Sequence, residues 1–236
     1  MLVVNPAYKA ITEDWFDPEY WGWNARPVST GGRGSAWFVD SDQGGMVLRH
    51  YRRGGLVARL SEKSYIYLGH DRTRSFREFH LLKALYDRGL PVPEPVAAWS
   101  KTHNGVCYRA SIIIRRIDGA EPWPEVVRLD DEGLWHRIGG MIRRFHDAGL
   151  DHVDLNCDNI LVAGDDVYLI DLDRCRLRPG TAGGQWQRAN LRRLWRSVVK
   201  RMSKFTETQR DSLWECLMAG YHKHPLSGPE SGNTVL

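Results

Sequence analysis

The most informative segment of the chain is His152-Val-Asp-Leu-Asn-Cys-Asp-Asn159, which stands between a predicted helix and a predicted strand. The helix ends near Gly149, and the short strand follows over 160–162. A turn over 164–166 then leads into a second strand, which ends at Asp171. Because Asp and Asn are common turn residues, a simple polar turn is the alternative interpretation. Polar positions at this spacing, bracketed by two apolar strands, favour a functional loop instead.

The polar residues of this loop suit phosphoryl transfer, which depends on positioning and charge neutralisation. One carboxylate must orient the attacking hydroxyl, and two oxygen ligands must hold Mg²⁺ on the phosphates. Asp154 can orient or deprotonate the hydroxyl, whereas Asn159 and Asp171 can bind the metal. We expect the hairpin to bring Asp171 beside Asn159. His152 is expected to support the loop through backbone hydrogen bonds and to take no part in proton transfer.

The elements predicted before and after residue 118 differ in kind. Residues 1–24 are rich in aromatic side chains and are expected to form an extended lead-in that packs on the body. Gly and Pro over 118–124 indicate a linker. We therefore predict an α+β fold with a strand-rich N-lobe over 1–117, made of an antiparallel sheet and one helix, and a mainly helical C-lobe over 118–236. The predicted elements are strands over 36–39, 46–51, 96–99 and 107–117 and helices over 75–88, 131–148, 187–203 and 206–221.

Glu78 occupies an unusual place for a carboxylate. With Leu82 and Leu85 it lies on the apolar stripe of its helix, where an unpaired charge would be costly. It therefore needs a cationic partner, and Arg49 in the second predicted strand is the obvious one. The alternative interpretations are a surface glutamate that reaches solvent and an exposed strand arginine.

The bulk composition is that of an ordinary globular protein. The apolar content is 42% and the net charge is +4, which does not by itself predict a nucleic-acid partner. The four cysteines are widely scattered, which disfavours a zinc site. No run of residues has the length and apolarity of a membrane span, so we expect a protein on the cytoplasmic side that is soluble or peripherally attached. The helix near 187–204 is amphipathic, and it either lies on a membrane surface or packs on the C-lobe.

The loop resembles the catalytic segment of the protein-kinase-like superfamily, His-Arg-Asp-Leu-x-x-x-Asn followed by Asp-Phe-Gly. Leu169-Ile-Asp-Leu-Asp173 stands where Asp-Phe-Gly would be, so Asp171 takes the place of the magnesium-binding residue. Two departures favour the small-molecule branch, which includes aminoglycoside and choline kinases. Asp173 replaces the glycine, and no Ala-Pro-Glu segment follows. The resemblance implies a two-lobed kinase-like fold that binds ATP and Mg²⁺ between its lobes.

The same resemblance assigns roles in the N-lobe. Arg49 stands where the family has a lysine that contacts the phosphates, and Glu78 would be its partner. The segment Gly31-Gly-Arg-Gly34 would lie over the ATP phosphates, with the backbone of Gly32 and Gly34 close to them. A plain glycine turn is the alternative interpretation of that segment.

Five segments carry a more specific resemblance, namely Val47-Leu-Arg-His-Tyr-Arg-Arg-Gly-Gly55, Phe76-Arg-Glu-Phe79, Gly89-Leu-Pro-Val-Pro93, His152–Asn159 and Leu169-Ile-Asp-Leu-Asp-Arg-Cys175. They resemble the 3-deoxy-D-manno-octulosonic acid (Kdo) kinase family. It implies transfer of the ATP γ-phosphate to the 4-hydroxyl of Kdo on a lipid A precursor, at the cytoplasmic face of the inner membrane. The partners would be this lipid-linked acidic sugar and the anionic membrane surface, with no nucleic acid. The open alternatives are a kinase for another core sugar such as heptose, a kinase for a soluble molecule such as an aminoglycoside, and a pseudokinase scaffold. Arginines that could bind the acidic acceptor are Arg52, Arg53, Arg72, Arg74 and Arg174.

Overall fold

The computed structural model divides the chain into two compact units. Unit 1 contains Met1–Ala120 together with Tyr168–Cys175, and unit 2 contains Glu121–Val167 and Arg176–Leu236. A short piece of the second half of the sequence, which includes Asp171, therefore belongs to unit 1. The residues that the structure describes are 1–28, 36–51, 65–66, 73–103, 107–179 and 184–223.

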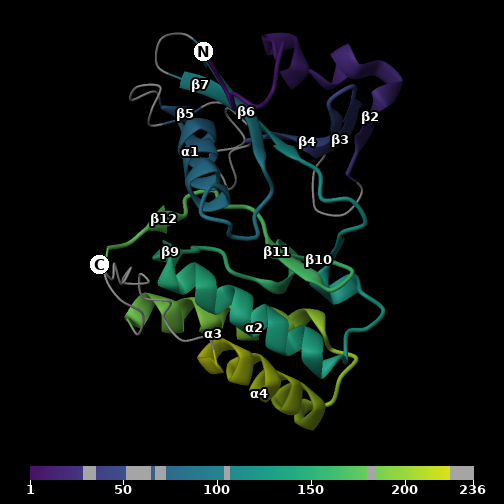
Figure 1. The fold of residues 1–236 in the computed structure, drawn as a ribbon, viewed down its shortest axis with the longest axis vertical. Coiled ribbons are helices and arrows are strands. Elements are labelled where there is room, and N and C mark those ends of the chain that lie inside the picture. Colours follow the sequence, from purple (N-terminus) through teal and green to yellow (C-terminus); the bar gives the residue numbers. More distant parts are fainter. Residues whose placement is uncertain (29–35, 52–64, 67–72, 104–106, 180–183, 224–236) are drawn as a thin grey trace, which may run out of the picture. The chain divides into compact units, whose positions relative to one another are not determined.

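Unit 1 is built on an antiparallel sheet of seven strands (Figure 1). The strand order is β1-β6-β7-β4-β3-β2, and β5 pairs with β7. The strands are β1 (Leu2–Val4), β2 (Ala25–Pro27), β3 (Ala36–Ser41), β4 (Gly44–His50), β5 (Tyr65–Ile66), β6 (Pro95–His103) and β7 (Cys107–Arg115).

The two faces of this sheet have different partners. Met46 and Leu48 of β4 point to one face, where they pack with Trp15 and Phe16 of the N-terminal segment. This segment forms two 3-10 helices, η1 (Glu13–Phe16) and η2 (Pro18–Asn24). It therefore packs on the body as expected, but as helical turns. Because side chains alternate along a strand, Arg49 points to the opposite face.

Helix α1 (Arg74–Tyr86) lies against that opposite face and confirms the helix predicted over 75–88. Phe76, Phe79, Leu82 and Leu85 are buried, and burying one such side chain stabilises a fold by roughly 2 kcal/mol. Glu78 is buried in the same stripe. The helix ends before Gly89, whose φ of 68° is left-handed and suits glycine.

Unit 2 is mainly helical, and its two most closely packed helices are α2 (Glu132–Asp147) and α4 (Glu207–Lys223). A Cβ atom at Gly139 would lie 1.9 Å from the carbonyl oxygen of Leu217, so glycine permits this close approach. The side chain of Asp131 begins α2 by accepting a hydrogen bond from the amide of Leu134. Helix α3 (Gln185–Arg201) and α4 confirm the two helices predicted after residue 184.

Short strands connect the helices of unit 2. Strand β10 (Ile160–Ala163) pairs with β8 (Glu121–Pro122) and β11 (Asp166–Leu169), while β9 (Leu150–Asp151) pairs with β12 (Arg176–Leu177). The last two residues of β11, Tyr168 and Leu169, are counted with unit 1. Strands β10 and β11 confirm the hairpin predicted after the polar loop. The 3-10 turns are η5 (Trp123–Glu125) and η6 (Cys157–Asn159).

Candidate active site

Arg49 is the centre of a partly buried group of charged side chains in unit 1. Its Nη2 donates to both carboxylate oxygens of Glu78, at 2.5 Å for Oε1, and its Nη1 donates to Oδ1 of Asp171. The hydroxyl of Tyr51 donates to Oε2 of Glu78 over 2.5 Å. Glu78 is only 4% exposed, and a buried carboxylate requires such partners. The pairing of Arg49 with Glu78 that the sequence indicated is therefore present, and Asp171 shares the same arginine.

The electrostatics of this group follow from burial and from the opposite charges. Burial alone would lower the pKa of Arg49, but the attraction of Glu78, with Asp171, raises it well above its usual value. Burial raises the pKa of Glu78, and the charge of Arg49 opposes that change. The planar fork of Arg49 bonds two carboxylates from different segments through two separate nitrogen atoms. The single ammonium group of a lysine lacks this fixed fork geometry.

A second ion pair joins the same two segments. Arg74, the first residue of α1, donates from Nε to Oδ1 of Asp173 over 2.8 Å and from Nη2 to Oδ2. We call the whole set the charged cluster. It consists of Arg49, Tyr51, Arg74, Glu78, Asp171 and Asp173.

The polar loop His152–Asn159 lies in unit 2 and is organised by local hydrogen bonds. The side-chain amides of Asn156 and Asn159 donate to the carbonyl oxygen of Asp154 over 3.1 and 3.0 Å. Asn156 also accepts from the amide of Asn159 over 3.1 Å and so caps the turn η6. The side chain of Asp154 is exposed, which leaves its carboxylate accessible. The sequence analysis did not predict the role of Asn156. An Asn at the N-cap position, three residues before the residue whose amide it binds, is a recognised capping signal.

His152 is buried at the start of the loop. Its carbonyl oxygen accepts from the amide of Leu155 over 3.3 Å and from Nη1 of Arg193 over 3.4 Å. The backbone support expected of His152 is thus present, and it includes a contact from α3.

Two expectations from the sequence remain predictions. Gly32 and Gly34 lie outside the described residues. Asp171 belongs to unit 1 and Asn159 to unit 2, so their expected proximity remains a prediction too. Among the described residues, no group of three or more His, Cys, Asp or Glu side chains could hold a metal ion alone. The donor set of Asp171 and Asn159 suits Mg²⁺, which typically binds one or two carboxylates together with substrate phosphates.

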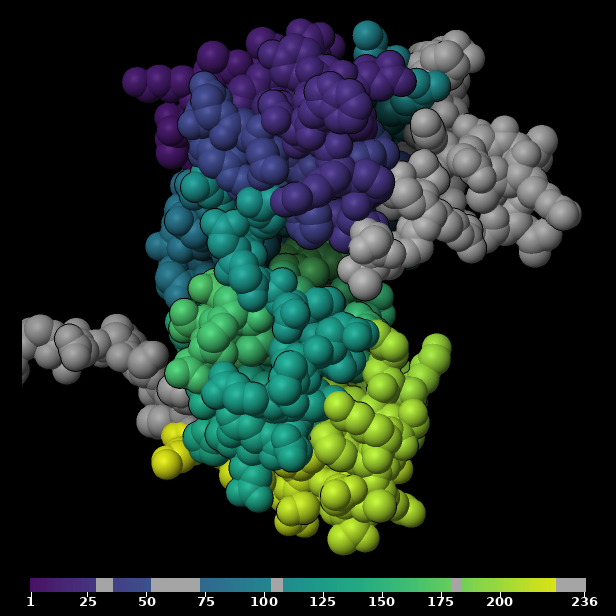
Figure 2. Space-filling model, turned by 90° about the vertical axis from the view of Figure 1, so that its right-hand side faces the viewer, coloured from purple at the N-terminus to yellow at the C-terminus, as the bar shows by residue number. Residues whose placement is uncertain are grey.

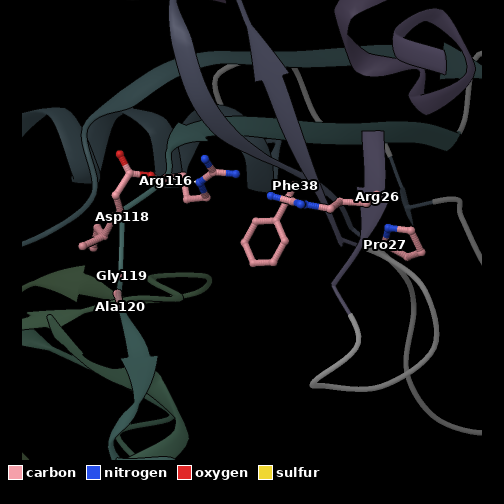
Figure 3. A pocket seen from close by; sticks show the side chains of 8 residues that line it. Arg26, Pro27, Phe38, Arg116, Asp118, Gly119 and Ala120 are labelled. Carbon is pink, nitrogen blue, oxygen red and sulfur yellow. Dashed lines mark hydrogen bonds and ion pairs between the residues drawn. The ribbon is translucent and has the colours of Figure 1, made fainter. Parts of the chain in front are cut away.

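A hollow of about 450 Å³ opens on unit 1 beside Phe38 (Figure 3). The guanidinium carbons of Arg26 and Arg116 lie 5.9 and 5.8 Å from the centre of the Phe38 ring. Phe38 is opposite Val47 in the sheet, and Val47 is two residues from Arg49, so Phe38 and Arg49 share one face. The hollow therefore opens on the sheet face that carries the arginine of the charged cluster. It is lined by Arg26, Pro27, Phe38, Arg116, Ile117, Asp118, Gly119 and Ala120.

Comparisons with known proteins give four relevant matches. The model of the lipopolysaccharide kinase (Kdo/WaaP) family matches residues 18–221. A 3-deoxy-D-manno-octulosonic acid kinase of Stenotrophomonas maltophilia (strain K279a) is 50% identical over 188 residues, which are 78% of this chain and 74% of that protein. Its counterpart in Xanthomonas campestris pv. campestris (strain B100) is 46% identical over 209 residues, which are 87% and 82% of the two chains. The solved structure of WaaP in complex with acyl carrier protein has a TM-score of 0.55 at 16% identity, over 96% of this chain and 90% of that chain. This structural likeness confirms the predicted protein-kinase-like α+β fold.

Proposed function

The chain belongs to the lipopolysaccharide kinase (Kdo/WaaP) family, and on that premise we propose that it transfers the γ-phosphate of ATP to the 4-hydroxyl of Kdo on a lipid A precursor. The observation that carries the proposal is the 50% identity with Kdo kinases over most of the chain. The family match over residues 18–221 includes both the charged cluster and the polar loop. Transfer of phosphate to a hydroxyl is the reaction of this family.

The charged cluster and the hollow beside Phe38 supply the parts that ATP needs in unit 1. We assign the base of ATP to the hollow and its phosphates to Arg49, since both share one face of the sheet. Glu78 holds the Arg49 fork in place through two hydrogen bonds. The backbone of Gly32 and Gly34 is assigned to the phosphates as well, as the resemblance of the glycine segment implies.

Asp171 and Asn159 are assigned to Mg²⁺. The carboxylate of Asp171 and the side-chain oxygen of Asn159 are hard oxygen ligands, and the Nδ2 atom of Asn159 is already engaged with the carbonyl of Asp154. Bound magnesium would neutralise charge on the phosphates. If Asp171 held the metal in place of Arg49, Nη1 of Arg49 would become available to the phosphates while Nη2 stayed on Glu78.

Asp154 is assigned to the acceptor hydroxyl. Its exposed carboxylate accepts the hydroxyl proton while the sugar oxygen bonds to the γ-phosphorus. The bond between the γ-phosphorus and the bridging oxygen breaks, and ADP leaves. The two asparagine side chains on the Asp154 carbonyl hold the backbone at the position that this role requires.

We further propose that the acceptor is reached at an anionic membrane surface, and α3 provides the surface for contact. Its exposed stripe has cations at four-residue intervals, and α3 lies in the lime-coloured part of the surface in Figure 2. Within the described part of the chain, Arg192, Arg196 and Lys200 form no ion pair. None of the described helices is long and apolar enough to span a membrane. The exposed acidic side chains of α4 would be repelled, so α3 rather than α4 faces the lipid. The stripe consists of Arg188, Arg192, Arg196 and Lys200.

The test is a phosphate-transfer assay with a panel of acceptors. Kdo–lipid A precursor, a heptose-bearing core and an aminoglycoside are each offered with ATP and Mg²⁺, and the phosphorylated product is located by mass spectrometry and NMR. We expect transfer to the 4-hydroxyl of Kdo and none to the other two acceptors. Absence of transfer to Kdo–lipid would overturn the proposal.

The membrane part of the proposal is tested with acceptor-carrying vesicles, by measuring how tightly the wild type and two variants bind them. Substituting Ala at Arg192, Arg196 and Lys200 should weaken binding to anionic vesicles about 100-fold, because each cation near such a surface contributes about 1 kcal/mol. The control removes three exposed cations of unit 1, Lys9, Lys101 and Arg109, and so makes the same change in net charge. Equal losses in the two variants would show that net charge, and not α3, governs binding.

A further inference from the structure

Asp173 stands where the kinase pattern led us to expect glycine, and its carboxylate is held by an arginine. The bond from Arg74 Nε to Asp173 Oδ1 is 2.8 Å long, and Nη2 of the same arginine bonds the other oxygen. The two side chains are only 20% and 15% exposed. A guanidinium that bonds both oxygens of a carboxylate fixes orientation as well as charge. Arg74 is therefore engaged with Asp173, although the sequence suggested it for the acceptor.

Tyr51 connects this ion pair to Arg49. The guanidinium carbons of Arg49 and Arg74 lie 5.1 and 5.2 Å from the centre of the Tyr51 ring, and its hydroxyl bonds Glu78. Tyr51 is buried at 5% exposure, so its ring has little freedom to move. One aromatic ring thus serves both arginines of the charged cluster.

The segment that these arginines hold has an unusual backbone. Asp171 and Arg174 both have φ of 60°, a left-handed conformation that residues with side chains adopt infrequently. Leu172 between them is buried, and its carbonyl oxygen accepts from the amide of Cys175 over 3.0 Å. Such a conformation persists only where surrounding contacts determine it. Asp173 is the residue of this turn that forms a partly buried ion pair with the first residue of α1.

We propose that Arg74 and Asp173 are positioning residues for the metal-binding carboxylate of Asp171. Two links join α1 to this turn, one through Glu78, Arg49 and Asp171, and one through Arg74 and Asp173. The proposal rests on the assignment of Asp171 to Mg²⁺ in the proposed function. When Asp171 exchanges Arg49 for the metal, the first link opens. The second link remains, and it keeps Asp171 at the end of a turn that is still fixed to α1.

The experiment measures the affinity for ADP with Mg²⁺ and with EDTA, because this measurement needs no acceptor. The wild type should bind ADP more tightly with Mg²⁺. Arg74→Ala and Asp173→Asn should lose about 10- to 100-fold of this magnesium-dependent gain, the usual effect of removing a group that orients a metal ligand. Their affinity for metal-free ADP should stay close to that of the wild type, since neither side chain is assigned to the nucleotide.

Three further variants separate positioning from a general structural role. Arg74→Lys keeps the charge without the fork and should recover only part of the gain. The double variant Arg74→Ala with Asp173→Asn should be no worse than either single change, because both remove the same interaction. Arg77→Ala removes an exposed arginine from the same helix and should leave the gain unchanged.

Thermal unfolding identifies variants that fold poorly. If Arg74→Ala is among them, Asp173→Asn, which keeps the shape of the side chain, provides the test. The proposal is overturned if folded Asp173→Asn and Arg74→Ala keep the magnesium-dependent gain within about twofold of the wild type. It is also overturned if these variants lose affinity for ADP by the same factor with Mg²⁺ and with EDTA. Failure to phosphorylate Kdo–lipid would leave this result interpretable, because the acceptor takes no part in the measurement.

Discussion

Unit 1 and unit 2 each bury a group of polar side chains, but one group is charged and the other is neutral. In unit 1, Arg49 and Glu78 are held together as ions. In unit 2, Nδ1 of His146 and the hydroxyl of Tyr221 are 2.8 Å apart, and Nδ2 of Asn190 is 3.5 Å from Nε2 of the same ring. Burial lowers the pKa of His146 from 6.5 to about 3, so the ring is neutral at physiological pH.

The two units differ in how closely stability and function are combined. A buried ion pair costs desolvation, and well-packed apolar side chains often stabilise a fold as well or better. Unit 1 keeps buried charges where phosphates and a metal are assigned, so a change there affects folding and binding together. Unit 2 has its assigned reactive carboxylate, Asp154, on the surface. Inside it holds the neutral group around His146 and, apart from that group, the carboxylate of Asp151, which pairs with Arg178 over 2.8 Å. Changes in unit 2 should therefore separate activity from stability.

The largest effect is expected at Asp154, where an exposed reactive carboxylate should affect activity but not stability. Asp154→Ala should lower turnover by about 10³-fold or more, since a general base contributes roughly 10²- to 10⁴-fold and the hydroxyl also loses its orienting partner. ATP binding should survive, and the free energy of unfolding should change by less than about 0.5 kcal/mol because the side chain is exposed. Steady-state kinetics and denaturant titration measure the two quantities.

The matched control for this prediction lies in the same loop. Asp158 is also exposed, and its carboxylate bonds the Nε atom of Arg201 over 2.9 Å. Asp158→Ala should keep the turnover of the wild type and lose at most about 1 kcal/mol of stability. Unchanged turnover in Asp154→Ala, or equal losses in the two variants, would reject the role assigned to Asp154.

The next effect is expected at Glu78, where the comparison predicts a loss of stability. Glu78→Ala removes the buried partner of this ion pair and leaves the partly buried guanidinium of Arg49 with Asp171 as its remaining carboxylate partner in the charged cluster. Breaking a buried pair in this way should lower the free energy of unfolding by about 3 kcal/mol, measured by denaturant titration. ATP affinity should fall as well, because the Arg49 fork loses its support.

Asp87→Ala is the control for Glu78. Asp87 lies at the exposed end of the same helix, where it pairs with Lys83 over 2.6 Å, and such surface pairs contribute at most about 1 kcal/mol. If the two variants unfold with equal losses, the charged cluster contributes no more than a surface ion pair.

The contrast between the units also explains what the sequence could predict. The polar loop and the helices depend on residues close in the sequence, so spacing and capping signals revealed them. The partner of Glu78 was predictable because a carboxylate on an apolar stripe needs a cation. Strands of two or three residues, such as β1 and β9, were missed because they are too short for an alternating pattern to be recognised.

The contacts that complete the charged cluster could not be predicted from spacing. Arg49 and Asp171 are 122 positions apart, and Arg74 and Asp173 are 99 positions apart. Their meeting depends on the register of the sheet and on the left-handed turn at Asp171, and the sequence carries no glycine to announce that turn. The hollow beside Phe38 likewise depends on which face of β3 the ring occupies.

A smaller effect is expected at His146, and its direction follows from the lowered pKa. Below pH 6.5 the unfolded chain binds a proton at this histidine, whereas the folded ring resists protonation until about pH 3. Stability from this group is therefore complete above pH 6.5 and is lost as the pH falls towards 3. Between pH 6.5 and 4.5 the loss should be about 2 to 3 kcal/mol, at 1.4 kcal/mol for each unit.

The measurement compares the free energy of unfolding of the wild type with that of His146→Gln across this range, so that the groups common to both cancel. The variant is expected to be less stable at neutral pH but to have the shallower decline. His136→Gln, on the same helix but only partly buried, should keep the slope of the wild type. Equal slopes for the wild type and His146→Gln would mean that the folded ring accepts a proton. The group around His146 would then be charged, as the charged cluster of unit 1 is, and the contrast between these two groups would fail.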